Sequence, residues 1–281
     1  MVDTPFHPQS RYQCGPASLA TILLASGVDV GVERLTNDVF IPGRKGSLQL
    51  EMVAATRQHG LLPYQPDSDF DGLMRFLNQG SPVLVLMNPG LRVLPVYHYA
   101  VLIGYIPAAD QVILRSGRDY RLTMPRSQFT PAWDKAGKWS LVALRPGHIP
   151  GKINIDRYLE SVMAMETIGK TEEAGQGYRA LVELSPGNTL ARFGLANTLY
   201  ARGKFEQAVT HYGHVLVIDK EHFPARNNLA DSLLKLGRCE QALAAISYDG
   251  DSTKWQSAVA QAFQQTRAEI EKTCRFYAGS G

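Results

Sequence analysis

A step of about 34 residues recurs through the second half of the sequence and limits what that half can fold into. Strand patterns are missing from about residue 151 onward, so helices must carry the period. A repeating unit of this length cannot bury its apolar face alone and becomes stable by stacking on its neighbours. The sequence therefore predicts an all-α repeat domain over residues 151–281. Three kinds of residue keep the step: Gly169, Gly203 and Gly237; Ala174, Ala208 and Ala242; Tyr178, Tyr212 and Ile246.

The best copy of the unit resembles the tetratricopeptide repeat. It reads Leu195-Ala196, Leu199, Gly203, Ala208 and Tyr212. The resemblance implies helix pairs, with glycine near the turn and alanine where the helices cross. We expect about three repeats and a C-terminal capping helix over about Thr253–Phe276. The repeats are expected to recruit a protein partner through a groove. Polar residues expected on or near it are Arg192, Asn197, Arg226, Asn227 and Asp231.

Residues 1–150 follow a different pattern, with helices first and strands afterwards. Helical patterns cover about 14–26, 31–39, 47–59 and 69–79. Strand patterns then cover Pro82–Met87, His98–Ile106, Gln111–Arg115, Arg121–Met124 and Trp139–Leu144. This order predicts an α+β domain with an antiparallel sheet. Pro107–Asp110 is expected to form a hairpin connection.

Cys14 and His98 are the residues that point to chemistry in this half. Cys14 begins a helical stretch whose long apolar surface anchors it in a core. Unpaired N–H groups and the helix dipole at such a position favour the thiolate over the thiol. His98 lies far downstream, in a segment of strand composition. A cysteine and a histidine distant in sequence are typical of a nucleophile with its base.

Residues 5–145 resemble the papain-like cysteine peptidases of family C39, the bacteriocin-processing, double-glycine type and its stand-alone relatives. The segments that carry the resemblance are Phe6–Gln9, Gln13–Leu19 and Tyr97–Tyr105. It implies a papain-like fold in which Cys14 attacks a peptide carbonyl. His98 would hold the thiolate as an ion pair and then protonate the leaving amine. Cleavage after small residues is expected.

The resemblance also implies a glutamine that stabilises the oxyanion together with the Cys14 N–H. Gln9 is the first candidate, although it lies five residues before Cys14, one fewer than in the transporter-fused peptidases. Gln13 is the second, but a residue adjacent to the nucleophile should point elsewhere.

The third catalytic position departs from the family, which places Asp or Asn in a turn at a strand end downstream of the histidine. Ser116 stands there, and its hydroxyl can accept a hydrogen bond from the ring of His98 without bringing a charge. Asp119 would reach the ring only if the Gly117 turn folds it back, and Asp110 lies at the wrong end of the strand. We therefore expect slow or substrate-restricted activity.

Composition and charge exclude several classes. Hydrophobic residues at 44% and charged residues at 20% describe a globular protein, and a net charge of +3 without a basic face gives no sign of nucleic-acid binding. The sequence has no run of about 18 apolar residues, so no membrane span is expected. No His/Cys cluster has metal-ligand spacing, and neither a metal nor another cofactor is predicted.

Cys239 and Cys274 leave two possibilities open. They are either free buried thiols or one disulfide between the third repeat and the capping helix. A disulfide would imply an oxidising compartment, hence export, with a leader outside this sequence. Localisation thus stays open, with export slightly favoured over the cytoplasm.

Three functions agree with these observations. The first is a cysteine peptidase acting on a peptide or protein. The second is a weak or inactive papain-like scaffold that binds peptides, favoured by the missing carboxylate. The third keeps the chemistry but transfers an acyl group from an amide or thioester.

Overall fold

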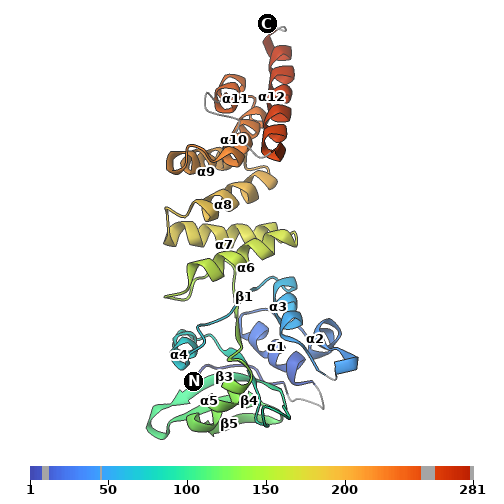
Figure 1. Ribbon diagram of the computed structural model, residues 1–281, viewed down its shortest axis with the longest axis vertical. Coiled ribbons are helices and arrows are strands. Elements are labelled where there is room, and N and C mark those ends of the chain that lie inside the picture. The colour runs from blue at the N-terminus through green and yellow to red at the C-terminus, as the bar shows by residue number, and fades with distance from the viewer. Residues whose placement is uncertain (8–12, 45, 248–256, 279–281) are drawn as a thin grey trace. The chain divides into compact units, whose positions relative to one another are not determined.

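The computed structural model describes residues 1–7, 13–44, 46–247 and 257–278 (Figure 1). The chain divides into two compact units, Met1–Ile168 and Gly169–Gly281. The sequence boundary near residue 150 marks where the patterns change, and the division between the compact units comes later, after Ile168. None of the helices in the described ranges is long and apolar enough to cross a membrane.

The first unit is an α+β domain, as the sequence predicts. Its helices are α1 (Cys14–Ala25), α2 (Val32–Val39), η1 (Pro42–Arg44), α3 (Gln49–Gln58), α4 (Phe70–Asn78), η2 (Pro107–Ala109), α5 (Arg126–Lys135) and α6 (Ile155–Thr167). Its strands are β1 (Leu62–Tyr64), β2 (Val83–Met87), β3 (His98–Ile106), β4 (Gln111–Ser116), β5 (Asp119–Pro125) and β6 (Ser140–Leu144).

The strands form one antiparallel sheet in the order β1-β6-β2-β3-β4-β5. Strand β3 is its longest member, and Met87 of β2 pairs with His98 at the start of β3. At the other end Ile106 pairs with Gln111, so Pro107–Asp110 forms the predicted hairpin connection. Asp110 adopts the left-handed conformation there, with φ of 47°. The hairpin therefore returns the end of β4 to the start of β3.

The core of this unit forms where α1 packs against β2, β3, β4 and β6. Every residue of α1 from Gly15 to Leu23 is buried. On α4, Asp69 caps the helix by accepting a hydrogen bond from the Gly72 N–H at 2.5 Å, and Asp71 lies in the first turn. The apolar core residues come from both layers and are Leu19, Ile22, Leu23, Leu35, Met52, Leu84, Tyr99, Val101, Ile103 and Leu141.

Two elements escaped the sequence analysis. Strand β1 has three residues with Pro63 in the middle, and it lies at the edge of the sheet, where a proline is tolerated. Helix α5 contains Pro131, which a helix interior rarely accepts. Both elements therefore depend on tertiary packing more than on local preference.

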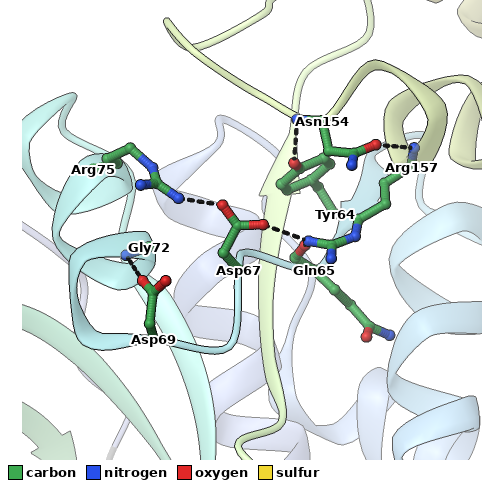
Figure 2. Close-up of polar contacts among 8 residues, drawn as sticks. All are labelled: Tyr64, Gln65, Asp67, Asp69, Gly72, Arg75, Asn154 and Arg157. Atoms are coloured by element: carbon green, nitrogen blue, oxygen red, sulfur yellow. Dashed lines mark hydrogen bonds and ion pairs between the residues drawn. The ribbon is translucent and has the colours of Figure 1, made fainter.

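Helix α6 is held on the edge strand β1 by a set of polar contacts (Figure 2). The Asn154 N–H donates to the Tyr64 hydroxyl at 2.9 Å, and Ser161 Oγ donates to the Pro63 carbonyl at 3.0 Å. Arg157 Nη1 lies 2.8 Å from Asp67 Oδ1, and Arg75 pairs with the other oxygen of the same carboxylate. These contacts place α6 in the first compact unit.

The second unit is helical and resembles tetratricopeptide repeats. Its helices are α7 (Thr171–Leu184), α8 (Thr189–Ala201), α9 (Phe205–Ile218), α10 (Phe223–Lys235), α11 (Cys239–Ile246) and α12 (Ser257–Ala278). The start predicted for the last helix, at Thr253, lies outside the described residues.

The recurring residues occupy equivalent places in this unit. Gly169, Gly203 and Gly237 lie in turns before a helix, with φ of 78°, 70° and 72°. The three recurring alanines are fully buried on α7, α9 and α11. Gly194 has a separate role, because a Cβ there would lie 2.4 Å from the ring of Tyr178. The period of about 34 residues therefore arises because each unit repeats the same turn, with a glycine at positive φ, and the same close packing of helices at an alanine.

Helix α12 packs against α10 and α11, which agrees with the predicted capping role. Phe263 and Ile270 join the apolar cluster of Leu233, Ala242 and Ile246. Cys239 and Cys274 form a disulfide with a Cα–Cα distance of 5.6 Å. Of the two possibilities left open by the sequence, the structure contains the bridge.

We predict that thiol titration in denaturant without reductant finds one reactive thiol, which belongs to Cys14. The bridge closes a loop of 35 residues, so Cys239→Ser with Cys274→Ser should lower the free energy of unfolding by about 3–4 kcal/mol. Chemical denaturation of both proteins measures the difference. Three titratable thiols would contradict the bridge.

Candidate active site

Cys14 is the first residue of α1 and is half-buried. Gln13 precedes it as the N-cap residue. The first N–H groups of a helix have no hydrogen-bond partner within the helix. They point out of the helix start, on the side where Cys14 lies. Since the rest of the helix start is buried, Cys14 is where α1 meets the surface.

Glycine at position 15 allows a loop to come close to this helix start. A Cβ on Gly15 would lie 2.5 Å from Ser47 Oγ and 2.8 Å from Ser47 Cβ. The Ser47 carbonyl accepts a hydrogen bond from the Tyr99 hydroxyl at 3.3 Å. The Cys-Gly sequence therefore combines a thiol with the space that the neighbouring loop needs.

His98 begins β3 and contacts the residue that the sequence analysis placed beside it. His98 Nε2 lies 2.8 Å from Ser116 Oγ at the end of β4. Ser116 is buried, and burial lowers the pKa of His98 below its usual value. The ring is thus held by a neutral hydroxyl in a site that favours its uncharged form.

The two aspartates weighed as alternatives lie elsewhere. Asp119 is the register partner of Ser116 across the hairpin and is exposed, and no hydrogen bond or ion pair joins its carboxylate to another described residue. Asp110 accepts a hydrogen bond from the Tyr105 hydroxyl at 2.7 Å, at the far end of β4. Among the described residues, the side chain against His98 Nε2 is that of Ser116.

Cys14 and His98 line the same cavity, which has a volume of about 1380 Å³. Leu86, Tyr99 and Trp139 contribute apolar surface, and the rings of Tyr99 and Trp139 meet edge to face at 5.7 Å. Burial, followed by the charges of Cys14 and Glu51, raises the pKa of Tyr99. The Tyr99 hydroxyl therefore remains a protonated donor beside the thiol.

Gln9 lies outside the described residues. Gln13 is described, and it directly precedes Cys14 in the chain. No group of three or more His, Cys, Asp or Glu side chains that could hold a metal ion occurs in the part of the chain that the structure describes.

Several residues of this cavity were missed by the sequence analysis. Ser47, Arg44 and Arg118 come from loops, where no periodic pattern indicates which way a side chain points. Tyr99 and Trp139 belong to predicted strands, where an aromatic side chain is expected in the core and gives no sign that it lines a cavity. The sequence held one signal for the loop residue Ser47. A glycine directly after a cysteine at a helix start indicates that another part of the chain comes close to the backbone there.

Residues 1–141 match the profile of the Peptidase_C39 like family. A comparison with curated proteins found no match. A putative C39-like peptidase from Bacillus anthracis is similar in structure, with 18% identity and a TM-score of 0.42, over 50% of this chain and 94% of that one. A double glycine motif protease from an AMS/PCAT transporter, solved with its leader peptide, has 20% identity and a TM-score of 0.38, over 50% and 91%.

The Sgt2 TPR domain from Aspergillus fumigatus is also similar, with 19% identity and a TM-score of 0.37. That similarity covers 43% of this chain and 82% of the fungal domain.

We predict that His98 titrates below the ordinary histidine value, because burial disfavours its charged form. Ser116→Asp should raise the pKa of His98, since a carboxylate against Nε2 favours the imidazolium. Ser116→Asn, of similar size but uncharged, serves as the control and should shift it less. NMR titration of the His98 ring measures all three. An equal pKa in the wild type and the Asp variant would contradict the assigned contact.

Proposed function

Because the chain belongs to the Peptidase_C39 like family, we propose that it is a cysteine peptidase with Cys14 as nucleophile and His98 as base. The observation that carries the proposal is that Cys14 at a helix start and His98 at a strand start line one cavity. A helix N-terminus favours the thiolate, and a neighbouring imidazole can accept the thiol proton.

The contact of His98 with Ser116 assigns roles to the two ring nitrogens. When Nε2 donates to Ser116 Oγ, Nδ1 is the unprotonated nitrogen and is the one that accepts the proton of Cys14. The Cys14 thiolate then attacks the carbonyl carbon, and the imidazolium returns its proton to the leaving amine as the C–N bond breaks. Water attacks the thioester next, and its proton passes through His98 to restore the thiol and release the acid.

Ser116 is proposed as the residue that positions the imidazole. A hydroxyl supplies the hydrogen bond but no negative charge, so it stabilises the imidazolium less than a carboxylate would. The buried surroundings of His98 also oppose that charged form. We therefore expect a slower enzyme than one with an aspartate at this position.

Gln9 and the Cys14 N–H are proposed as the two donors that stabilise the oxyanion. Donors aimed at a developing negative charge typically contribute about 3–4 kcal/mol each. The family resemblance and the position of Cys14 at a helix start, where the first N–H groups have no partner within the helix, support this assignment. Small residues are proposed on the acyl side of the scissile bond, because the substrate backbone must come close to the helix start.

A catalytically idle, papain-like scaffold that binds peptides is the second candidate. The observation that favours it is the neutral residue against His98 Nε2. Selective alkylation of Cys14 near pH 6–7 separates the two, because an idle site has no need of an activated thiolate.

We predict that Cys14→Ala lowers peptide cleavage by at least about 1000-fold, since it removes the nucleophile. The substitution should change the free energy of unfolding by no more than about 1–2 kcal/mol. Cleavage assays and denaturation of the same preparation measure the two effects. Cys239→Ser with Cys274→Ser is the control and should retain cleavage. Undiminished cleavage by the Ala variant would refute the assignment.

We also propose that the repeats recruit a protein partner through polar groups on α8 and α10. Asn197 Oδ1 accepts hydrogen bonds from the Tyr212 hydroxyl at 2.8 Å and from Asn228 Nδ2 at 3.2 Å. Asn227 Nδ2 donates to Asn228 Oδ1 at 3.4 Å, while Asn227 Oδ1 is buried and lacks a partner among the described residues. This amide oxygen is the proposed acceptor for a backbone N–H of a partner, which it meets when the Asn227 amide turns toward the groove.

The other polar residues expected at the groove are already engaged. Arg192 Nη2 donates to the Pro186 carbonyl at 2.7 Å, and Arg226 Nη2 donates to the Lys220 carbonyl at 3.1 Å. The two donors are one repeat period apart, and so are the two acceptors, so these arginines perform the same structural task in successive units. Asp231 accepts from the Tyr200 hydroxyl.

Asn227→Ala should raise the KM for a natural protein substrate about twofold to tenfold, because the variant loses one hydrogen bond to that substrate. Cleavage of a short peptide that lacks the segment bound by the repeats should stay unchanged, because Asn227 has no contact to lose. Gln207→Ala, an exposed residue on α9, is the matched control. Steady-state kinetics with both substrates measure the effect. Equal losses with the two substrates would refute recruitment through Asn227.

A further inference from the structure

Two arginines from separate loops line the cavity that contains Cys14 and His98. Arg44 ends η1, and Arg118 lies with Gly117 in the turn between β4 and β5. Both side chains belong to exposed residues. The cavity therefore receives a guanidinium from each of two parts of the chain that are far apart in the sequence.

Neither guanidinium is engaged by another described residue in a hydrogen bond or an ion pair. Arg115 shows the contrast, because it is buried and donates to the Thr4 carbonyl at 2.7 Å. No aspartate or glutamate lies among the described residues that line the cavity. The charge of Glu51 reaches Tyr99 from outside the lining, so Arg44 and Arg118 are the permanently charged groups among the described lining residues themselves.

The hairpin links Arg118 to the catalytic geometry. Ser116 pairs with Asp119 in the register, and the two residues between them form the turn. Gly117 adopts φ of 61°, a conformation that glycine tolerates better than other residues. The turn that ends β4 with Ser116 against His98 also brings Arg118 to the cavity. The turn therefore fixes the backbone of Arg118 beside the cavity.

The remaining walls offer few partners for a charged group. Leu48, Leu50 and Trp139 are apolar, so a carboxylate that enters the cavity finds its strongest donors in the two arginines. A volume of about 1380 Å³ corresponds to roughly 11 Å across, which accommodates about three residues of an extended chain.

We infer that Arg44 and Arg118 select substrates that carry a carboxylate within about three residues of the scissile bond. The inference rests on the proposed function, because it takes Cys14 as the nucleophile. The carboxylate is either an aspartate or glutamate side chain or the free C-terminus of the peptide. Small residues next to the scissile bond remain compatible with it, since the charge lies at a neighbouring position.

Two alkylating agents of similar size test the charge preference without a known substrate. Iodoacetate and iodoacetamide both form a C–S bond to Cys14 as iodide leaves, and only iodoacetate carries a carboxylate. The ratio of the iodoacetate rate to the iodoacetamide rate should fall about threefold to tenfold in Arg44→Gln and Arg118→Gln, and salt should reduce the difference. The iodoacetamide rate should stay constant, which shows that the thiol itself is unaltered.

Two further variants serve as controls. Arg118→Lys keeps the charge and should keep most of the ratio. Arg121→Gln removes an exposed arginine of β5 that does not line the cavity, and it should leave the ratio unchanged. An unchanged ratio in both Gln variants overturns the inference while leaving the proposed function intact. A Cys14 that reacts with neither reagent overturns the proposed function itself.

Peptides distinguish the two sources of the carboxylate. In a peptide that the wild type cleaves, a preference for Glu over Gln near the scissile bond that disappears in the Arg variants supports a side chain. A preference for the free C-terminus over its amide supports the terminal carboxylate. Equal cleavage of all four peptides, by the wild type and the variants, overturns the inference.

Discussion

The burial of α1 is the constraint on which the rest of the catalytic unit depends. From Gly15 to Leu23 every residue of this helix is buried, so it cannot rotate or slide without exposing apolar surface. Its start is thereby held at one place relative to β3, against which α1 packs. A site on a rigid element keeps its geometry better than a site on a loop. The half-buried Cys14 is consequently placed by the same packing that stabilises the domain.

The other half of the site depends on charge and burial at the end of β3. A carboxylate against His98 would offset the burial of the ring, whereas the hydroxyl of Ser116 orients the ring and leaves its charge uncompensated. Burial of the ring acts in the same direction, because it disfavours the imidazolium. A substrate carboxylate would relieve that penalty on binding. The neutral residue against His98 and the two arginines of the lining would thus both favour the acidic substrates inferred above.

Local patterns in the sequence predicted the elements that have strong periodicity. The repeat period predicted the turns at Gly203 and Gly237, because stacked helix pairs repeat one geometry. The family resemblance placed Ser116 at the third catalytic position, and in the structure Ser116 Oγ lies 2.8 Å from His98 Nε2. Strand β1 and helix α5 were missed because Pro63 and Pro131 contradict the local preference. Arg44 and Arg118 were missed because their loops meet only in the folded domain, and Gln9 lies outside the described residues.

Helix α6 of the first unit and helix α12 of the second unit are stabilised by different means. Repeat helices gain stability from their neighbours, so the first and last of a stretch lack one source of it. Helix α6 lies in the first unit, where the edge strand β1 supplies its packing surface together with the contacts from Tyr64 and Asp67. The last helix, α12, has no following helix in the described part of the chain and is tied to α11 by the Cys239–Cys274 bridge. Helix α6 therefore depends on the sheet edge of its own unit, whereas α12 depends on a covalent bond within the helical unit.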